Sequence, residues 1–394
     1  MNYEAPPEAE STRLNDFSFT GSALEYFGIW IVNLLLSILT LGIYTAWAKV
    51  RRQRYFYGNT WLDGHNFEYH ARPMQILIGR VIVIGYLVLI NVLNEVNPIL
   101  GLILTIPYLL ALPWVFNKAI SFNARMTSYR NVHFNFRGSY WRALGIFIGL
   151  PLLAFVPLGI VAGIAGIVAS GDAGSAVFVA VLLPIAFLAA ILFIPFVSRA
   201  STNYIGNNTS FGDAGFSIDV GLKPIYANLG ASVLFCIAST IGITVIIGGL
   251  FVLITGAELN PEAVQNPLNN IGTFALFFLI GILAYSPFIL AYLFYSAGMR
   301  NIAFNAAYLD GKHRLASRIS RTRYLWIIVS NAAATILSVA LLRPWAAVRT
   351  WRYLTFNTYF ASQGSLDSFI NVQEDKGNVI AAEYLDIDGI DFGL

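Results

Sequence analysis

The chain has 394 residues, of which 57% are hydrophobic and only 11% are charged. Soluble domains carry about 25% charged residues. With a mean hydropathy of +0.65, this composition excludes a soluble globule and indicates an integral membrane protein. The single cysteine, Cys236, lies in an apolar run, which excludes an intramolecular disulfide and a metal or redox site built on paired cysteines. The net charge of +3 is small, so the position of the charges along the chain matters more than their sum.

The chain is expected to begin with a polar tail and an entry strand, residues 1–23. Its first stretch, MNYEAPPEAESTRLND, is polar and acidic and lacks the basic region and cleavage site of a signal peptide. We therefore expect the first apolar run to stay in the mature protein. A repeated transmembrane domain is predicted for residues 24–358, and an acidic cytoplasmic tail for 359–394.

Long apolar runs dominate the rest of the sequence. A helix needs about 20 apolar residues to cross a bilayer core of about 30 Å. This predicts an all-α polytopic membrane protein with about eight membrane segments. The runs are 24–46, 74–93, 98–117, 142–169, 175–197, 226–255, 271–297 and 324–345.

The connections between these segments alternate in charge. Those at 94–97, 170–174 and 256–270 contain no Lys or Arg, whereas the intervening connections are basic. By the positive-inside rule, the basic connections are expected to be cytoplasmic.

The first and last segments conflict with this alternation. The eighth segment has basic residues on both sides, and Phe17–Ser22 before the first segment resembles Phe134–Ser139, which lies on the basic side. Either both segments are re-entrant, with breaks at Thr40–Ile43 and Leu342–Pro344, or one is an ordinary span that violates the charge rule. The sequence leaves both interpretations open.

A fourteen-residue motif occurs near both ends of the chain. WAKVRRQRYFYGNT at 47–60 and WAAVRTWRYLTFNT at 345–358 share eight identical positions. Weaker echoes start at Pro113, Pro195 and Pro287. The pattern predicts internal parallel repeats, with the two terminal copies as neighbours in space.

Short alternating runs follow several of these motifs. They predict strands at 67–70, 132–136 and 216–219, and another in the tail at 379–392. Together they predict a small cytoplasmic β layer made from loops and termini.

The motif also supplies the candidate site. Trp47, Arg51, Arg54 and Tyr55 are spaced at i, i+4, i+7 and i+8, which places them on one helix face. The second copy repeats the face with the residues Trp345, Arg349, Arg352 and Tyr353. Their chemistry predicts one anionic-ligand or lipid-headgroup site assembled from both copies. The alternative is an interfacial aromatic belt with snorkelling arginines.

Other polar residues are weaker candidates. Asn33 and Asn331 each lie fourteen residues before the motif tryptophan, where interhelical hydrogen bonds are favoured over substrate contact. The histidines lack the spacing of a metal site, so no metal is predicted; they are His65, His70, His133 and His313. No nucleotide-binding or catalytic motif is present, and we predict no cofactor.

The stretch EYFGIWIVNLLLSILTLGIYTAWAKVRRQRYFYGNTWLDG, residues 25–64, resembles the YjgN family of bacterial multi-pass inner-membrane proteins, a domain of unknown function. The run FEYHA at 67–71 and the acidic, glycine-containing tail are also similar to that family. The resemblance implies a bacterial inner-membrane location and carries no activity, substrate or catalytic residue.

The functional prediction is a transport, channel or ligand-binding module rather than an enzyme. The alternatives are a membrane scaffold or assembly factor, which would dock partners or anionic lipid through the basic loops, and an interfacial lipid-acting enzyme. The expected partners are the bilayer and anionic headgroups, not nucleic acid.

Overall fold

The strands of this protein close into a single antiparallel barrel. The computed structural model describes residues 12–168, 173–255 and 271–374. In it the strand order is β1-β10-β9-β8-β7-β6-β5-β4-β3-β2, and β2 pairs back with β1. The strands are β1 (Thr12–Phe19), β2 (Thr60–Leu62), β3 (His65–Tyr69), β4 (Thr127–Tyr129), β5 (Val132–Phe136), β6 (Thr209–Phe211), β7 (Ala214–Ile218), β8 (Ala307–Leu309), β9 (His313–Ser317) and β10 (Thr358–Gln363).

Tight turns connect the strands in hairpins. Asp63 and Gly64 between β2 and β3 have φ of 46° and 77°, and Arg130 and Asn131 between β4 and β5 have φ of 49° and 65°. Positive φ at both central residues is the requirement of a type I′ turn, whose twist matches that of the flanking strands. The first and last strands also pair with each other: β1 is antiparallel to β10, with Asn15 opposite Phe360.

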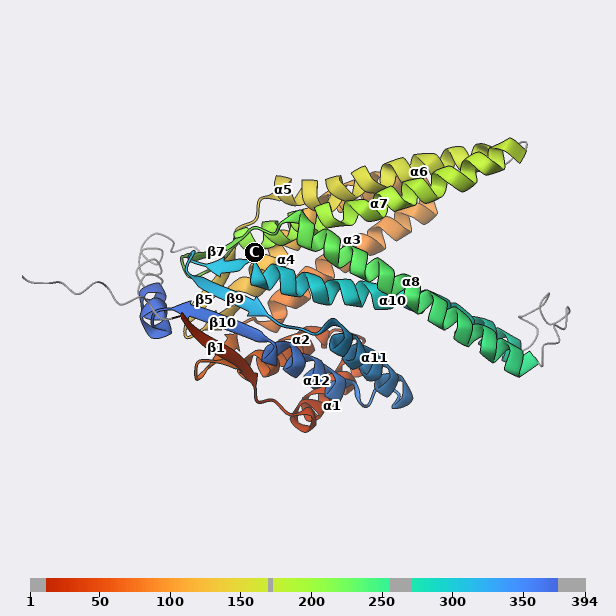
Figure 1. Cartoon of the computed structure of the whole chain (residues 1–394). Coiled ribbons are helices and arrows are strands. Elements are labelled where there is room, and N and C mark those ends of the chain that lie inside the picture. The colour runs from red at the N-terminus through yellow and green to blue at the C-terminus, as the bar shows by residue number, and fades with distance from the viewer. Residues whose placement is uncertain (1–11, 169–172, 256–270, 375–394) are drawn as a thin grey trace, which may run out of the picture.

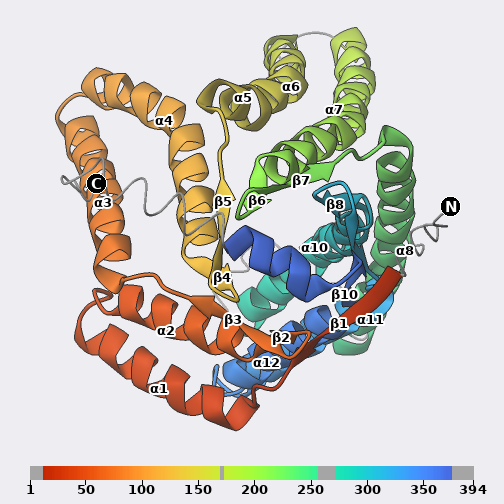
Figure 2. The same cartoon turned by 90° about the vertical axis from the view of Figure 1, so that its left-hand side faces the viewer.

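Helix pairs link each hairpin to the next. They extend to one side of the barrel (Figure 1) and are arranged around its axis (Figure 2). The pairs are α1 with α2, α3 with α4, α5–η1–α6 with α7, α8 with α10, and α11 with α12. Their bounds are α1 (Ala23–Leu39), α2 (Thr45–Gly58), α3 (Pro73–Val96), α4 (Pro98–Arg125), α5 (Tyr140–Leu144), the π-helical η1 (Gly145–Gly149), α6 (Leu150–Val168), α7 (Ala173–Asn207), α8 (Leu222–Thr255), α10 (Ile271–Asn305), α11 (Arg321–Leu337) and α12 (Arg343–Phe356).

The prediction of about eight membrane segments is wrong. Within the described residues, six helices are long and apolar enough to cross a membrane, and they belong to the three long pairs. The first and last predicted segments instead fold as short pairs. Helix α1 has 17 residues, which span about 25 Å at 1.5 Å per residue and fall short of the bilayer core.

Each short pair reverses the chain in a five-residue turn. Leu41 and Gly42 have φ of 49° and 92°, and Val339 and Ala340 have φ of 49° and 69°. The first turn coincides with the predicted break at Thr40–Ile43. The second turn, at 338–342, comes before Pro344, which is in the first turn of α12. Both short pairs therefore begin and end at the barrel.

The all-α prediction is also wrong, because the β structure is a closed ten-stranded barrel. Four of its ten strands have only three residues, too few for an alternating pattern to stand out in a sequence. Pairings such as Phe67 with Tyr129 and Phe134 with Phe211 join separate hairpins, so no local signal reveals them. The predicted tail strand at 379–392 lies outside the described residues.

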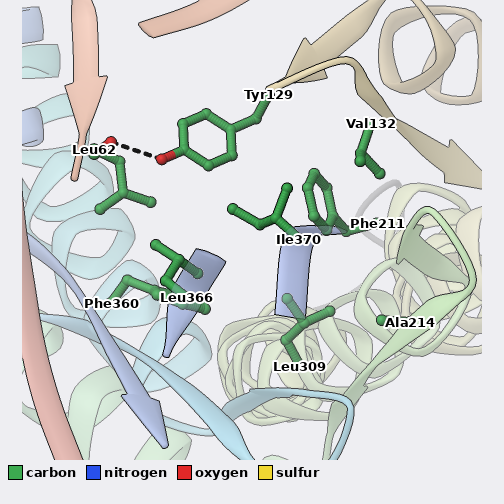
Figure 3. Packing of buried hydrophobic residues seen from close by; sticks show 9 residues of the cluster. All are labelled: Leu62, Tyr129, Val132, Phe211, Ala214, Leu309, Phe360, Leu366 and Ile370. Carbon is green, nitrogen blue, oxygen red and sulfur yellow. Dashed lines mark hydrogen bonds between the residues drawn. The ribbon is translucent and has the colours of Figure 1, made fainter. Parts of the chain in front are cut away.

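Side chains from every strand fill the barrel. The buried cluster in the barrel takes at most one residue from each strand, and it packs with partly buried Phe17, Phe67, Phe134, Phe216 and Leu315. Figure 3 shows how they converge on the axis. The buried cluster consists of Leu62, Tyr129, Val132, Phe211, Ala214, Leu309, Phe360, Leu366 and Ile370.

A short helix at 366–374 closes one end of the barrel; it is the blue helix at the centre of Figure 2. Leu366 and Ile370 from this plug helix enter the barrel core. Its polar face is held by an ion pair of Asp367 with Arg130 and by a hydrogen bond from the Asp213 N–H to Gln373 Oε1, at 3.0 Å. The barrel is a packed core at this end.

Tyr129 provides a test of this packing. Its hydroxyl donates to Leu62 O at 2.6 Å, and burial raises its pKa from 10.0 to about 12. Tyr129→Phe should cost about 1–3 kcal/mol, because it leaves a buried carbonyl without its donor. The folded state holds the phenol proton more tightly than the unfolded chain, so this stabilisation is complete below pH 10 and is lost as pH rises toward 12. Thermal unfolding of both proteins should be measured from pH 8 to pH 12. The difference between their unfolding midpoints should be constant up to pH 10 and should shrink above it. A difference that widens above pH 10 would contradict this assignment.

Candidate anionic-ligand site

The end of the repeated motif forms the junction between helix and strand. Asn59 Nδ2 donates to Tyr55 O at 2.8 Å, and Thr60 Oγ1 donates to Phe56 O at 2.7 Å. The second copy repeats both bonds, from Asn357 to Tyr353 O at 2.7 Å and from Thr358 to Leu354 O at 2.8 Å. These side chains bond carbonyls of the last helical turn, where backbone donors run out. The Asn-Thr pair is therefore structural.

The motif tyrosines anchor each exit helix to the start of its own pair. The Tyr55 hydroxyl donates to Ser22 O at 2.7 Å, just before α1, and the Tyr353 hydroxyl donates to Ser320 O at 3.1 Å, just before α11. Tyr204 does the same on α7, donating to Ser139 O at 2.9 Å. The tyrosine position thus has one role in three helix pairs.

The second arginine of the face holds the neighbouring connection. Arg54 Nε and Nη2 donate to Tyr69 O and Ala71 O, both at 3.2 Å. Arg352 Nη2 donates to Gly21 O at 2.8 Å. All three carbonyls lie where the chain leaves a barrel strand and enters a helix. Much of the identity between the two copies is therefore explained by hydrogen bonds that join helices to the barrel.

Arg349 has a different environment. Its Nη1 donates to Ser330 Oγ at 2.6 Å and to Asn331 Oδ1 at 3.0 Å, and its Cζ lies 5.1 Å from the centre of the Trp345 ring. Asn331 in turn donates to Ala346 O at 3.0 Å. This network fixes the guanidinium between α11 and α12, with donors remaining beyond the two that these bonds use.

Arg349 lines an open cleft of about 590 Å³ between α12, α11 and the start of α1. Three guanidinium groups reach it, and the lining includes no carboxylate. Trp326 and Trp345 are 66% and 39% exposed, so indole rings are also available to a ligand. The lining residues are Ala23, Arg323, Trp326, Ile327, Trp345, Val348, Arg349, Arg352, Tyr353, Phe356 and Asn357.

The N-terminal copy does not line this cleft. Arg51 is exposed, and Trp47 stacks on Tyr44 with ring centres 5.9 Å apart. Asn33 is buried, and its Oδ1 has no hydrogen-bond partner among the described residues. Of the eight residues predicted to form one site, the structure brings Trp345, Arg349, Arg352 and Tyr353 together in the cleft, without Trp47, Arg51, Arg54 or Tyr55.

The two copies nevertheless lie side by side. Phe56 of the first and Trp351 of the second have ring centres 4.9 Å apart, and Val348 joins the same buried cluster. The contact runs through helix faces other than the predicted one.

Two residues of the cleft, Arg323 and Trp326, are not among the predicted site residues. They lie three positions apart on α11, a spacing that places them on one face. Arg323 is also paired with the motif, because its Cζ lies 5.9 Å from the centre of the Tyr353 ring. An arginine followed three residues later by a tryptophan at the start of an apolar helix was the available signal.

The histidines do not assemble a metal site in the described part of the chain. His70 and His133 have ring centres 5.3 Å apart, but His133 Nδ1 contacts Arg125 O at 2.8 Å. His65 Nδ1 contacts Asp63 O at 3.0 Å, a backbone atom rather than the carboxylate. His313 lies in the barrel, where its Nδ1 accepts from the Gln363 N–H at 3.2 Å.

Comparison with known proteins places the chain among bacterial inner-membrane proteins. Inner membrane protein YjgN of Salmonella typhimurium is 29% identical over 368 residues, 91% of each chain. The protein of the same name from Escherichia coli O157:H7 is 30% identical over 207 residues, 52% of each chain. No solved structure matches. A family model described as a bacterial protein of unknown function, DUF898, matches residues 15–387. The chain is therefore an inner-membrane protein that belongs to the DUF898 family.

Proposed function

We propose that this protein is a membrane ligand-binding module that holds an anionic lipid headgroup in the cleft between α11 and α12. The observation that carries the proposal is the convergence of Arg323, Arg349 and Arg352 on one cleft whose lining includes no carboxylate. Guanidinium groups bind phosphate through two parallel N–H donors.

The order of residues along α12 suits a lipid. Arg352 is close to the barrel, and Trp345 lies seven residues deeper, which is about 10 Å along a helix. The headgroup would meet the arginines while the ester region and the upper acyl chain lie against Trp345 and Trp326. Indole rings favour this interfacial depth.

The proposal includes an orientation. The five helix-to-strand junctions all lead into the barrel, and the basic residues of the motif lie near them. By the positive-inside rule the barrel would face the cytoplasm. The recurring unit of helix pair and strand hairpin, with its repeated Tyr and Arg contacts, supports parallel repeats around the barrel axis.

Lipid binding by matched arginine variants tests the function. Arg349→Gln and its register equivalent Arg51→Gln each remove one charge from the same motif position. In nanodiscs that contain phosphatidylglycerol, retention of this lipid by native mass spectrometry should fall about fivefold for Arg349→Gln, since a basic residue near an anionic surface contributes about 1 kcal/mol. Arg51→Gln should retain the lipid.

Because Arg349 also bonds Asn331, Arg323→Gln serves as a second variant with less effect on helix packing. It should weaken binding to a similar extent, and added salt should reduce the difference from the wild type. If Arg51→Gln and Arg349→Gln lose equal amounts of phosphatidylglycerol, the motif arginines act only as a general basic surface. That result would refute the cleft as the binding site.

A further inference from the structure

A second cavity, of about 300 Å³, lies at the mouth of the barrel opposite the plug helix. Its floor is made by strand side chains that also belong to the barrel core, Phe17, Phe67 and Leu315. Helices α2 and α12 cover it, and α10 contributes a cation. The remaining lining residues are Tyr57, Thr60, Arg300, Phe304, Trp351, Leu354, Thr355 and Thr358.

Arg300 is the charged residue of this lining. Its Cζ lies 4.1 Å from the centre of the Phe304 ring, and its Nη2 donates to Thr358 Oγ1 at 2.9 Å. Its Nη1 is buried and has no hydrogen-bond partner among the described residues. The ion pairs of the described chain do not include it. Arg300 as a whole is half-buried. A guanidinium partly withdrawn from water without a counter-charge is costly, so an anion from outside the chain would stabilise it.

Two threonine hydroxyl groups of the cavity are already engaged. Thr60 Oγ1 donates to Phe56 O and accepts from Trp351 Nε1 at 2.9 Å, and Thr358 Oγ1 donates to Leu354 O. The rest of the wall is mainly aromatic and aliphatic. The cavity thus offers one cationic donor and an apolar space.

We propose that this cavity binds a fatty carboxylate, with its head on Arg300 and its acyl chain in the apolar space. An arginine fork matches a carboxylate in shape and charge. The cavity volume corresponds to about ten water molecules at about 30 Å³ each, which suits an acyl chain of about ten carbons. The site is separate from the headgroup cleft, so each can fail without the other.

Tryptophan quenching in nanodiscs of neutral phosphatidylcholine tests the proposal on the full chain. A ten-carbon carboxylate brominated at its far end should quench fluorescence, and Trp351→Phe should remove most of that quenching. Arg300→Gln should bind roughly tenfold to a hundredfold more weakly, because a charged hydrogen bond is lost. The matched control Arg318→Gln, which removes an exposed cation, should bind normally.

Further measurements test the proposal even if Arg300→Gln does not fold. Leu315→Trp keeps the guanidinium but fills the space, and it should abolish quenching. On the wild type, brominated decanol and a brominated decyltrimethylammonium should quench much less than the carboxylate. Equal quenching by decanol, or unchanged binding in Arg300→Gln, would overturn the proposal. Quenching by brominated phosphatidylglycerol that matches the carboxylate would assign the cavity to phospholipid and also overturn it.

Discussion

Replacing Ile370 by Asp is expected to destabilise the barrel by about 4 kcal/mol or more. Ile370 is 1% exposed and lies among Leu309, Phe360 and Leu366 in the core. Truncating such a side chain costs about 2–5 kcal/mol, and a carboxylate placed there is buried without a partner. The thermal unfolding midpoint of the purified protein should fall by roughly 5 °C.

Val372→Asp is the matched control for this prediction. It introduces the same residue on the same helix, at a side chain that is 51% exposed, and surface changes of this kind stay within about 0.5 kcal/mol. If both substitutions lower the midpoint equally, the plug helix does not belong to the cooperative core.

Cysteines at positions 51 and 349 should be labelled from the same side of the membrane. Helices α2 and α12 run into β2 and β10, and both strands are part of one closed barrel. Arg51 lies seven residues before the end of α2, about 10 Å from the barrel. A membrane-impermeant maleimide, applied to inside-out and right-side-out vesicles, should therefore give one pattern for both positions.

Glu95→Cys provides the opposite reference. It lies near the turn between α3 and α4, two of the membrane-length helices, so it should react from the other side. The native Cys236 is replaced by Ala in every variant. Labelling of positions 51 and 349 from opposite sides would contradict the short re-entrant pairs.

The two short helix pairs could be predicted only in part from the sequence. Hydropathy alone makes residues 24–46 look like a span, and the basic residues on both sides of the eighth segment were the hint that such a segment returns to its starting side. The turn at Leu41 and Gly42 lies within the predicted break at Thr40–Ile43. In the second pair the turn lies at Val339 and Ala340, without a glycine and before the predicted break at Leu342–Pro344.

The sequence also predicted only part of the candidate site. The spacing of Trp345, Arg349, Arg352 and Tyr353 placed them correctly on one face, and they share a cleft. The identical face of the first copy has other contacts, such as Arg54 with Ala71 O. Both copies keep hydrogen bonds that join the helix to the barrel, whereas the cleft of the second copy depends on its neighbours α11 and α1.

The sequence by itself determined the membrane environment, the family, the repeated motif and several strand positions, because apolar length, charge alternation and β periodicity are local properties. The tertiary structure decided the closure of the barrel, since its pairings join hairpins that are separated by whole helix pairs. It also decided the environment of the Arg300 side chain, which nothing in the sequence distinguishes from other basic residues. Only the convergence of five strands with α2, α10 and α12 buries its Nη1 and places the guanidinium beside an apolar cavity.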